Sequence, residues 1–351
     1  MSWFRPSPAD AVRAIGPSQP KMRVLYVLDH YPELSESYIQ TEIRILGEEY
    51  EIFIVSAQGG KVVPNPEGYP FTELSNFNKL VKLVREVRPQ VMHTHVLCDA
   101  RLLARLSDAT GVPFTIRGHS CSRADVPRYI HDLHLHLNDD RCLGVVILPY
   151  TREVLTTGGK VRPDKMTSVP PVLDFGRFYD RSPNQDGVMN LGPCLPKKKM
   201  TDFVDVAARF PGRKFSLYPL GHRIKELKAH NARCGSPVVV EDPRPHSAIP
   251  AEYKRHNWLL YTGCFSMATL GWPMTIMEAK ASGVVVCVAN VRLDIKEYVG
   301  DSGYAYNTLD EAAEIISSQP PAAMREAAFD HASSMDLRKH KHLLTDLWHS
   351  T

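Results

Sequence analysis

The stretch RVLYVLDHYPELSESYIQTEIRILGEEYEIFIVSA, residues 23–57, contains the pattern that decides the fold. Its first seven residues are mostly apolar without alternation, which is typical of a strand buried on both faces. From Ser37 onward isoleucine and leucine repeat at helical spacing, and Ser37 with Gln40 makes a capping box that predicts a helix start. A second apolar run, EIFIVSA, closes the unit. A strand, a helix and a strand in this order predict parallel strands joined by a crossover helix.

The same alternation continues through most of the chain, in two series. Strand-like runs at 90–96, 113–118 and 144–149 continue the first series. Residues 170–187, PPVLDFGRFYDRSPNQDG, are rich in proline, glycine and acidic residues, which indicates a linker. The second series begins directly afterwards with VMNLG and extends to the run GVVVCVA at 283–289. We therefore expect two domains of the same architecture.

These patterns predict an α/β protein with two doubly wound, Rossmann-like domains. A chain of 351 residues is also too long for one ordinary core. We expect an N-terminal extension over 1–21, a first domain over 22–180, a second over 181–333, and a C-terminal helix over 334–351 that packs back on the first domain. Two such domains facing each other leave a cleft at the carboxyl ends of their strands, where sheets of this type bind ligands.

The composition argues against several classes of protein. A formal net charge of only +3, with basic clusters that lack interleaved aromatic residues, gives no indication of a nucleic-acid partner. No apolar run approaches the ~20 residues that span a bilayer. The proline-rich N-terminus lacks the apolar core of a secretory signal. The seven cysteines occur singly, which favours reduced thiols in the cytoplasm over disulfides.

Three familiar kinds of site have no sequence signature in this chain. No G-x-G-x-x-G follows the first strand and no P-loop occurs, so dinucleotide binding of the usual Rossmann kind is not expected. The histidines of HDLHLH, 131–136, mix helical and strand spacing and have no cysteine nearby, so we expect no metal.

Two groups of candidate residues follow strands of the first domain. The loop PELSES precedes a helix whose first amides make a ready anion site, although N-capping alone would also explain its serines. The candidates in this loop are Glu33, Leu34 and Ser35. His119 lies just past the carboxyl end of a strand, which favours a ligand role over a purely structural one. His93 and His95 alternate along another strand, and we interpret them as structural or supporting residues.

The lysine loop NLGPCLPKKK is a candidate site in the second domain. It lies between a strand that ends at Gly192 and a helix that begins near Met200. Lysine is a compact cation on a flexible stem and suits a phosphate as a point charge. A solvated loop is the alternative, but a strand-to-helix turn beside the cleft favours a phosphate role for one of Lys197, Lys198 and Lys199.

The stretch GWPMTIMEAKASG, 271–283, is the other candidate in the second domain. It begins a helix whose first amides would point at a phosphate, aided by the helix dipole. The residues of this turn are Gly271, Trp272, Pro273, Met274 and Thr275. Glu278 lies about one turn further on, and a carboxylate suits a vicinal diol such as the hydroxyls of ribose. A surface glutamate is the alternative interpretation.

With these residues assembled, the chain resembles the retaining GT-B-fold glycosyltransferases of family four, the group 1 glycosyl transferases, and especially members that build bacterial polysaccharides and natural products. The resemblance covers about residues 22–330. HYPELSESYIQTEI resembles the N-terminal loop and helix of the family, and VMHTH and FTIRGHS resemble strands leading to its donor-sugar histidine, here His119. VPPVLDFGRF resembles the crossover segment, with Asp174 and Phe178 in place. KKKMTDFVDVAARF resembles the phosphate-lysine helix and puts Lys199 at the lysine, while GWPMTIMEAKASGVVVCVA resembles the donor-binding helix and the next strand.

The resemblance implies transfer of a sugar from a nucleoside diphosphate donor to a hydroxyl acceptor, with retention at the anomeric carbon and without a metal or other cofactor. It implies contacts from His119 to the donor sugar, from Lys199 and the 271–275 turn to the diphosphate, and from Glu278 to the ribose. Lys198 is a further donor-binding candidate, and Pro245 and His246 are expected to flank the base. The implied acceptor is a small molecule, a glycan or a lipid-linked molecule. We expect a cytoplasmic protein, with peripheral contact at the inner membrane face where the acceptor is lipid-linked.

Two positions depart from the family pattern. The donor-binding helix normally carries two glutamates eight positions apart, and the first of them falls on Leu270. An arginine usually follows the glycine that matches Gly192, and this chain has Pro193. These losses leave open a catalytically silent GT-B protein that binds a nucleotide sugar or a partner enzyme. A GT-B epimerase or phosphorylase is a third alternative.

Overall fold

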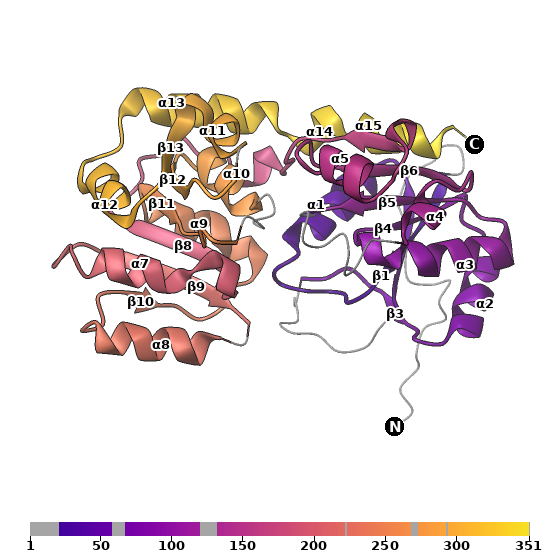
Figure 1. Ribbon diagram of the computed structural model, residues 1–351, viewed down its shortest axis with the longest axis horizontal. Coiled ribbons are helices and arrows are strands. Elements are labelled where there is room, and N and C mark those ends of the chain that lie inside the picture. Colours follow the sequence, from indigo (N-terminus) through magenta and orange to yellow (C-terminus); the bar gives the residue numbers. More distant parts are fainter. Residues whose placement is uncertain are drawn as a thin grey trace.

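The chain folds into two lobes that lie side by side, each built around a parallel sheet with helices on its faces (Figure 1). This computed structural model describes residues 21–57, 67–119, 132–221, 223–267, 273–292 and 294–350. We call the lobe that contains strands β1 to β7 the N-lobe, and the lobe that contains β8 to β13 the C-lobe. Two parallel α/β sheets are the architecture that the sequence predicts.

The N-lobe sheet has the strand order β3-β2-β1-β4-β5-β6-β7, with parallel pairing throughout. The order reverses between β1 and β4, which is where doubly wound sheets open a crevice for ligands. Its strands are β1 (Arg23–Leu28), β2 (Glu51–Ser56), β3 (Thr72–Glu73), β4 (Val91–Thr94), β5 (Phe114–Gly118), β6 (Cys142–Ile147) and β7 (Met166–Ser168). Its helices and helical turns are α1 (Ser37–Leu46), α2 (Phe77–Val87), η2 (Leu97–Asp99), α3 (Ala100–Thr110), α4 (His134–Leu137), α5 (Thr151–Glu153), η4 (Val154–Gly158) and η5 (Pro163–Lys165).

The C-lobe repeats this arrangement, with the strand order β10-β9-β8-β11-β12-β13 and a reversal between β8 and β11. Its strands are β8 (Val188–Pro193), β9 (Phe215–Leu220), β10 (Val239–Val240), β11 (Trp258–Tyr261), β12 (Val285–Ala289) and β13 (Gly303–Tyr306). Its helices and turns are α6 (Phe175–Phe178), η6 (Pro196–Lys198), α7 (Met200–Ala207), α8 (Ile224–Arg233), η7 (His246–Ala248), α9 (Ile249–Lys254), α10 (Met274–Ala281), α11 (Ile295–Val299), η8 (Gly300–Ser302), α12 (Leu309–Ser317) and α13 (Ala322–Ser334).

Strand β1 is buried on both faces, as its continuous apolar run predicts. Leu25 and Val27 join the hydrophobic cluster on one side of the sheet, and Val24, Tyr26 and Leu28 join the cluster on the other side. Both faces are therefore removed from water, and burying apolar surface contributes about 25 cal/mol per Å². This double burial fixes the register of β1, and with it the place where the next loop begins.

The chain crosses between the lobes twice, and the two crossings pair with each other. The amide of Leu173 donates to the carbonyl of Met335 at 3.0 Å, and the amide of Leu337 donates to the carbonyl of Leu173 at 2.8 Å. The neighbouring Asp174 is buried and forms ion pairs with Arg44 of α1 and Arg338. This junction joins the linker, the N-lobe and the end of the chain at one point.

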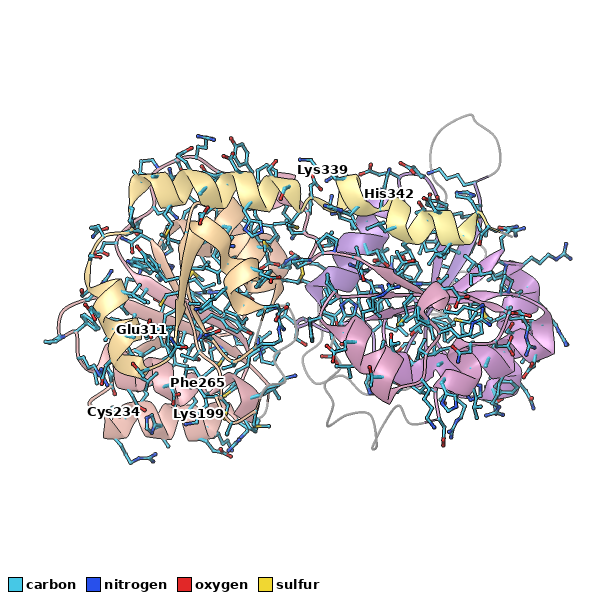
Figure 2. The ribbon with its side chains drawn as sticks, turned by 45° about the horizontal axis from the view of Figure 1, so that its top comes forward. Lys199, Cys234, Phe265, Glu311, Lys339 and His342 are labelled. Atoms are coloured by element: carbon cyan, nitrogen blue, oxygen red, sulfur yellow. The ribbon has the colours of Figure 1, made fainter. Side chains whose placement is uncertain are left out.

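After the second crossing, α14 (Leu337–His340) and α15 (His342–Trp348) run across the N-lobe, and Figure 2 shows Lys339 and His342 on this final segment. Helix α15 packs on β6 and β7. The Trp348 side chain is completely buried, and its indole Nε1 donates to Thr115 Oγ1 at 2.9 Å. By its contacts, the C-terminal segment therefore belongs to the N-lobe.

Several local features differ from the sequence-based expectation. Glu36, not Ser37, caps α1, and neither residue makes a side-chain cap, so the predicted capping box is wrong. The single C-terminal helix expected over 334–351 is two helices, α14 and α15. The short strands β3, β7 and β13 carry too few residues to show a pattern.

Replacing Trp348 by alanine is expected to lower the free energy of unfolding by about 3–5 kcal/mol, because a large buried side chain leaves a cavity. Urea denaturation followed by circular dichroism measures this change. Leu135→Ala is the control, since Leu135 is 65% exposed and its loss should cost little. A cost below about 1 kcal/mol for Trp348→Ala would show that the C-terminal segment does not support the N-lobe core.

Candidate functional site

A cavity of about 250 Å³ lies between the two lobes. Its walls come from residues at the carboxyl ends of strands in both sheets and from the segments that follow them. The N-lobe lining is Leu34, Ser35, Ser37, Tyr38, Thr41, Arg117, His119, Leu148, Pro171 and Val172. The C-lobe lining is Leu191, Gly192, Pro193, Leu195, Lys197, Lys198, Tyr218, Leu220, Pro243, Arg244, His246, Ile249, Tyr261, Pro273, Met274, Thr275 and Glu278, and Leu337 of α14 completes the wall.

His119 lines the cavity from the N-lobe, directly after β5. Its Nε2 lies 2.8 Å from Nδ1 of His95, and its ring lies 3.9 Å, centre to centre, from the ring of Tyr38. Burial holds the pKa of His119 well below its usual value, and the nearby His95 and Arg117 lower this pKa further. The imidazole is therefore neutral at physiological pH and can exchange hydrogen bonds with a neutral ligand.

Behind His119 lies a buried polar cluster centred on Glu42 of α1. Glu42 Oε1 accepts hydrogen bonds from the Tyr26 hydroxyl and from His95 Nε2, each at 2.9 Å. The Arg117 guanidinium pairs with Glu42 Oε2, and His93 Nε2 lies 3.3 Å from Oε1. Burial opposes ionisation of Glu42, but His95 and Arg117 outweigh it and hold the pKa of the carboxyl well below its usual range. Glu42 is therefore a carboxylate that accepts hydrogen bonds from Tyr26, His95 and Arg117.

The lysine loop brings Lys198 into the cavity. Lys198 ends the turn η6, its Nζ lies 4.9 Å from the centre of the Tyr261 ring, and its carbonyl accepts from Thr262 Oγ1 at 2.7 Å. A Cβ on Gly192, whose φ is +126°, would lie 2.8 Å from Lys198 Nζ, so the glycine leaves room for the ammonium. Burial, with a smaller effect of Lys197, lowers the pKa of Lys198 to about 7.

Lys199 does not line the cavity. Its backbone is left-handed, with φ 44° and ψ 49°, at the position directly before α7. The half-exposed ammonium lies 3.4 Å from Oδ1 of Asp202 in the first turn of α7. The resemblance placed the phosphate lysine at Lys199, and the structure instead brings its neighbour Lys198 to the site.

Glu278 lines the opposite wall from α10 and is only 5% exposed. Its Oε2 accepts from the Tyr253 hydroxyl at 3.0 Å, and its Oε1 lies 3.5 Å from Nε2 of His246. Helix α10 begins at Met274 after Pro273, so its first amides open toward the cavity that Thr275 also lines. A buried carboxylate and a helix N-terminus together can hold a polyhydroxylated anion.

The remaining predicted residues divide between the cavity wall and its surroundings. Leu34 and Ser35 line the cavity, whereas the buried Glu33 does not. His246 also lines it, whereas Pro245, the N-cap of the turn η7 that begins at His246, is not part of the wall. Gly271, Trp272 and Leu270 lie outside the described residues. Pro193 lines the cavity, so this part of the wall presents an apolar ring where the family resemblance leads one to expect a cation.

Sequence reasoning missed Tyr38, Arg117, Tyr218 and Arg244, all of which line the cavity. Arg117 stands two residues before His119, but its partner Glu42 is 75 residues away, so no local motif marks the pair. Arg244 lies two residues before His246, in a segment already expected at the cleft. Its proximity to a predicted site residue was the one available signal.

In the part of the chain that the structure describes, two groups of side chains bring possible metal ligands close together. Glu42, His93 and His95 form one, but Arg117 already pairs with that carboxylate. Asp205, His230 and Cys234 form the other, between α7 and α8 and outside the cavity wall. Neither group therefore offers a metal to a ligand in the cavity.

No protein-family model and no curated protein matches the chain by sequence. Solved structures match it over nearly its whole length. HepE from Anabaena, in complex with UDP and glucose, superimposes with a TM-score of 0.75 at 14% identity, covering 94% of this chain and 100% of that one. Sucrose-phosphate synthase from Thermosynechococcus elongatus gives 0.71 at 12% identity, with 94% and 100% covered. The lipopolysaccharide outer core galactosyltransferase WaaB, in its apo form, gives 0.63 at 12% identity, with 93% and 99% covered.

These likenesses show the fold of the chain. It is the GT-B fold, with two Rossmann-like domains, and this confirms the fold that the sequence predicts. No helix in the described ranges combines the length and apolar character needed to cross a membrane.

Proposed function

We propose that this chain transfers a sugar from a nucleoside diphosphate sugar to a hydroxyl acceptor, with retention at the anomeric carbon and without a metal. The observation that carries the proposal is that His119 of the N-lobe and Lys198 and Glu278 of the C-lobe line the same cavity. A donor of this class has a sugar, a diphosphate and a ribose in that order. The cavity offers a neutral imidazole, a lysine together with a helix N-terminus, and a carboxylate, which match these three parts.

In this assignment the diphosphate lies against Lys198 and the first amides of α10, with Ser35 approaching from the N-lobe. Glu278 binds the ribose hydroxyls, and His246 lies where the base would follow. That HepE is described in complex with UDP and glucose supports a uridine nucleotide as the first donor to test. The acceptor enters from the N-lobe side and is a small molecule, a glycan or a lipid-linked molecule at the inner membrane face.

The residues of the cavity suit a reaction that needs no protein nucleophile. Among the described lining residues, Glu278 is the only carboxylate, and Tyr253 and His246 already engage it. We therefore infer that the hydroxyl attacks on the face from which the diphosphate leaves, while a diphosphate oxygen takes its proton. Catalysis then rests on positioning the two substrates and on stabilising the departing phosphate charge.

The direct test of the reaction is a proton NMR assay with UDP-glucose and a panel of hydroxyl acceptors, in the presence of EDTA. The anomeric proton of the first product should show the small coupling of an α-linkage, because the donor is α-linked. A β-linked first product, or activity that EDTA abolishes and added metal restores, would contradict the proposed reaction.

Replacing Lys198 by alanine is expected to lower kcat about 100- to 1,000-fold, because the departing diphosphate loses its cation. Lys199→Ala is the matched control, since its half-exposed ammonium pairs with Asp202 outside the cavity, and its kcat should stay within about threefold of wild type. Steady-state kinetics compare the two variants. The reverse order, with Lys199→Ala the slower enzyme, would return the phosphate role to Lys199.

Donor binding should weaken as the pH rises through 7, because the pKa of Lys198 is about 7 in the free protein and only its protonated form attracts a diphosphate. The dissociation constant for UDP-glucose is expected to rise by up to about tenfold per pH unit above pH 7. Isothermal titration calorimetry between pH 6 and 9 measures this dependence. In Lys198→Arg, which stays protonated, the dependence should flatten. A steep profile in that variant would assign the titration to another group.

Pro193 supports a second candidate function, a catalytically silent GT-B protein that binds a nucleotide sugar or a partner enzyme. This residue presents no charge to the cavity at a wall position where the family resemblance leads one to expect an arginine. Calorimetric binding of UDP-glucose without turnover across the acceptor panel would favour this candidate over the transferase.

A further inference from the structure

The cluster behind His119 forms an ordered chain of hydrogen bonds that the proposed reaction does not by itself require. It runs from the Glu42 carboxylate through both nitrogens of His95 to Nε2 of His119 at the cavity wall. Each link is 2.8–2.9 Å long, and the His95 and Glu42 side chains are almost completely removed from water. Through such a chain, a buried carboxylate can determine which ring nitrogen of a histidine at the site carries the proton.

We propose that Glu42 and His95 are positioning residues that fix the tautomer of His119, and that His119 Nδ1 thereby selects a donor sugar presenting a hydroxyl, and not a carboxylate, at that point. The sugar part of this inference rests on the proposed function. The tautomer part rests on the ligand-free protein alone, so the two parts can be tested separately.

The Glu42 carboxylate determines which atom donates and which accepts in each of these hydrogen bonds. Its carboxylate pairs with Arg117, and an ionised carboxylate only accepts hydrogen bonds. Nε2 of His95 therefore carries a proton and donates to Glu42 Oε1. Burial lowers the pKa of His95 to about 4, although Glu42 partly opposes this change. The His95 ring is thus neutral and has one N–H, so its Nδ1 accepts.

The hydrogen bond between His95 and His119 determines the tautomer of His119. Because His95 Nδ1 accepts, the proton between the two rings belongs to His119 Nε2. The His119 ring is also neutral, so its Nδ1 carries a lone pair and no proton. Among the described residues only Nε2 of His119 has a hydrogen-bond partner, so Nδ1 is the ring nitrogen left for a ligand, and it can accept a hydrogen bond but cannot donate one. A sugar hydroxyl can donate to it, whereas a carboxylate offers only acceptors and a negative charge.

Glu42→Gln is expected to reverse the chain. Arg117 has donors only, so the amide oxygen of the new side chain should face Arg117 and its NH₂ group should face His95 and Tyr26. His95 Nε2 then accepts, and its Nδ1 donates to His119 Nε2. His119 is left with its proton on Nδ1, which turns the ligand-facing nitrogen from an acceptor into a donor.

The tautomers can be observed directly in the uniformly ¹⁵N-labelled protein by long-range ¹H–¹⁵N correlation at pH 7.5, with the His119 signals assigned by their loss in His119→Gln. The wild-type spectrum should show His119 protonated on Nε2, and Glu42→Gln should show it protonated on Nδ1. The matched control is His93→Gln, which also removes a histidine beside Glu42 but leaves the tautomer of His119 unchanged. A wild-type His119 protonated on Nδ1 or on both nitrogens overturns the proposal, and this measurement decides even where Glu42→Gln does not fold.

The selection is tested by calorimetry with UDP-glucose and UDP-glucuronate, which differ by a hydroxymethyl group against a carboxylate. The wild-type protein should prefer UDP-glucose by about tenfold or more, the equivalent of one hydrogen bond. Glu42→Gln should reduce this preference to within about threefold, because Nδ1–H can donate to either group. Equal wild-type affinities, or a preference that survives the tautomer change, would overturn the selection. Binding of neither donor by the wild-type protein would count against the proposed function and leave the tautomer result standing.

Discussion

The site depends on one geometric constraint. The carboxyl ends of the strands in the two sheets face each other, and in each sheet a crevice opens at the point where the strand order reverses. In each lobe the reversal follows the first strand, between β1 and β4 and between β8 and β11. Side chains cannot fill the crevice at such a point, because the crossover helices leave in opposite directions. The paired crossings at Leu173 and Leu337, with Asp174 bound to Arg44 and Arg338, hold the two crevices over one cavity.

Within that cavity, charge is distributed unequally between the lobes. The N-lobe neutralises its charges internally, since Arg117 pairs with Glu42, and burial keeps His95 and His119 neutral by lowering their pKa values. The C-lobe presents Lys198, whose pKa is lowered to about 7, and the N-terminus of α10, both in the wall of the cavity. Bringing a diphosphate to this lysine would restore the charged form of the amine. The same burial of Lys198 thus lowers its pKa in the free protein and favours an anion beside it.

The fold could be predicted from the sequence because its signals are local. The run at 23–29 is buried on both faces and the alternation repeats on both sides of a proline-rich linker, so two parallel sheets follow from periodicity alone. Short edge strands such as β3 could not be predicted from the sequence, because two residues are too few to show a periodicity. The capping box failed because Ser37 lies one position inside the helix.

The candidate site could be predicted only in part, for a physical reason. His119 and Glu278 follow strands or turns whose ends are marked in the sequence, and both line the cavity. Among three consecutive lysines, the choice depends on a left-handed backbone at Lys199, which composition does not reveal. The cluster around Glu42 joins α1, β4 and β5, so it exists only after the sheet has formed.

The most direct measurement of the central claim is a crystal structure of the protein soaked or co-crystallised with UDP. The account predicts a diphosphate within hydrogen-bond distance of Lys198 Nζ and the first amides of α10, with the ribose hydroxyls on Glu278. A nucleotide bound elsewhere on the molecule, with this cavity left to solvent, would contradict it.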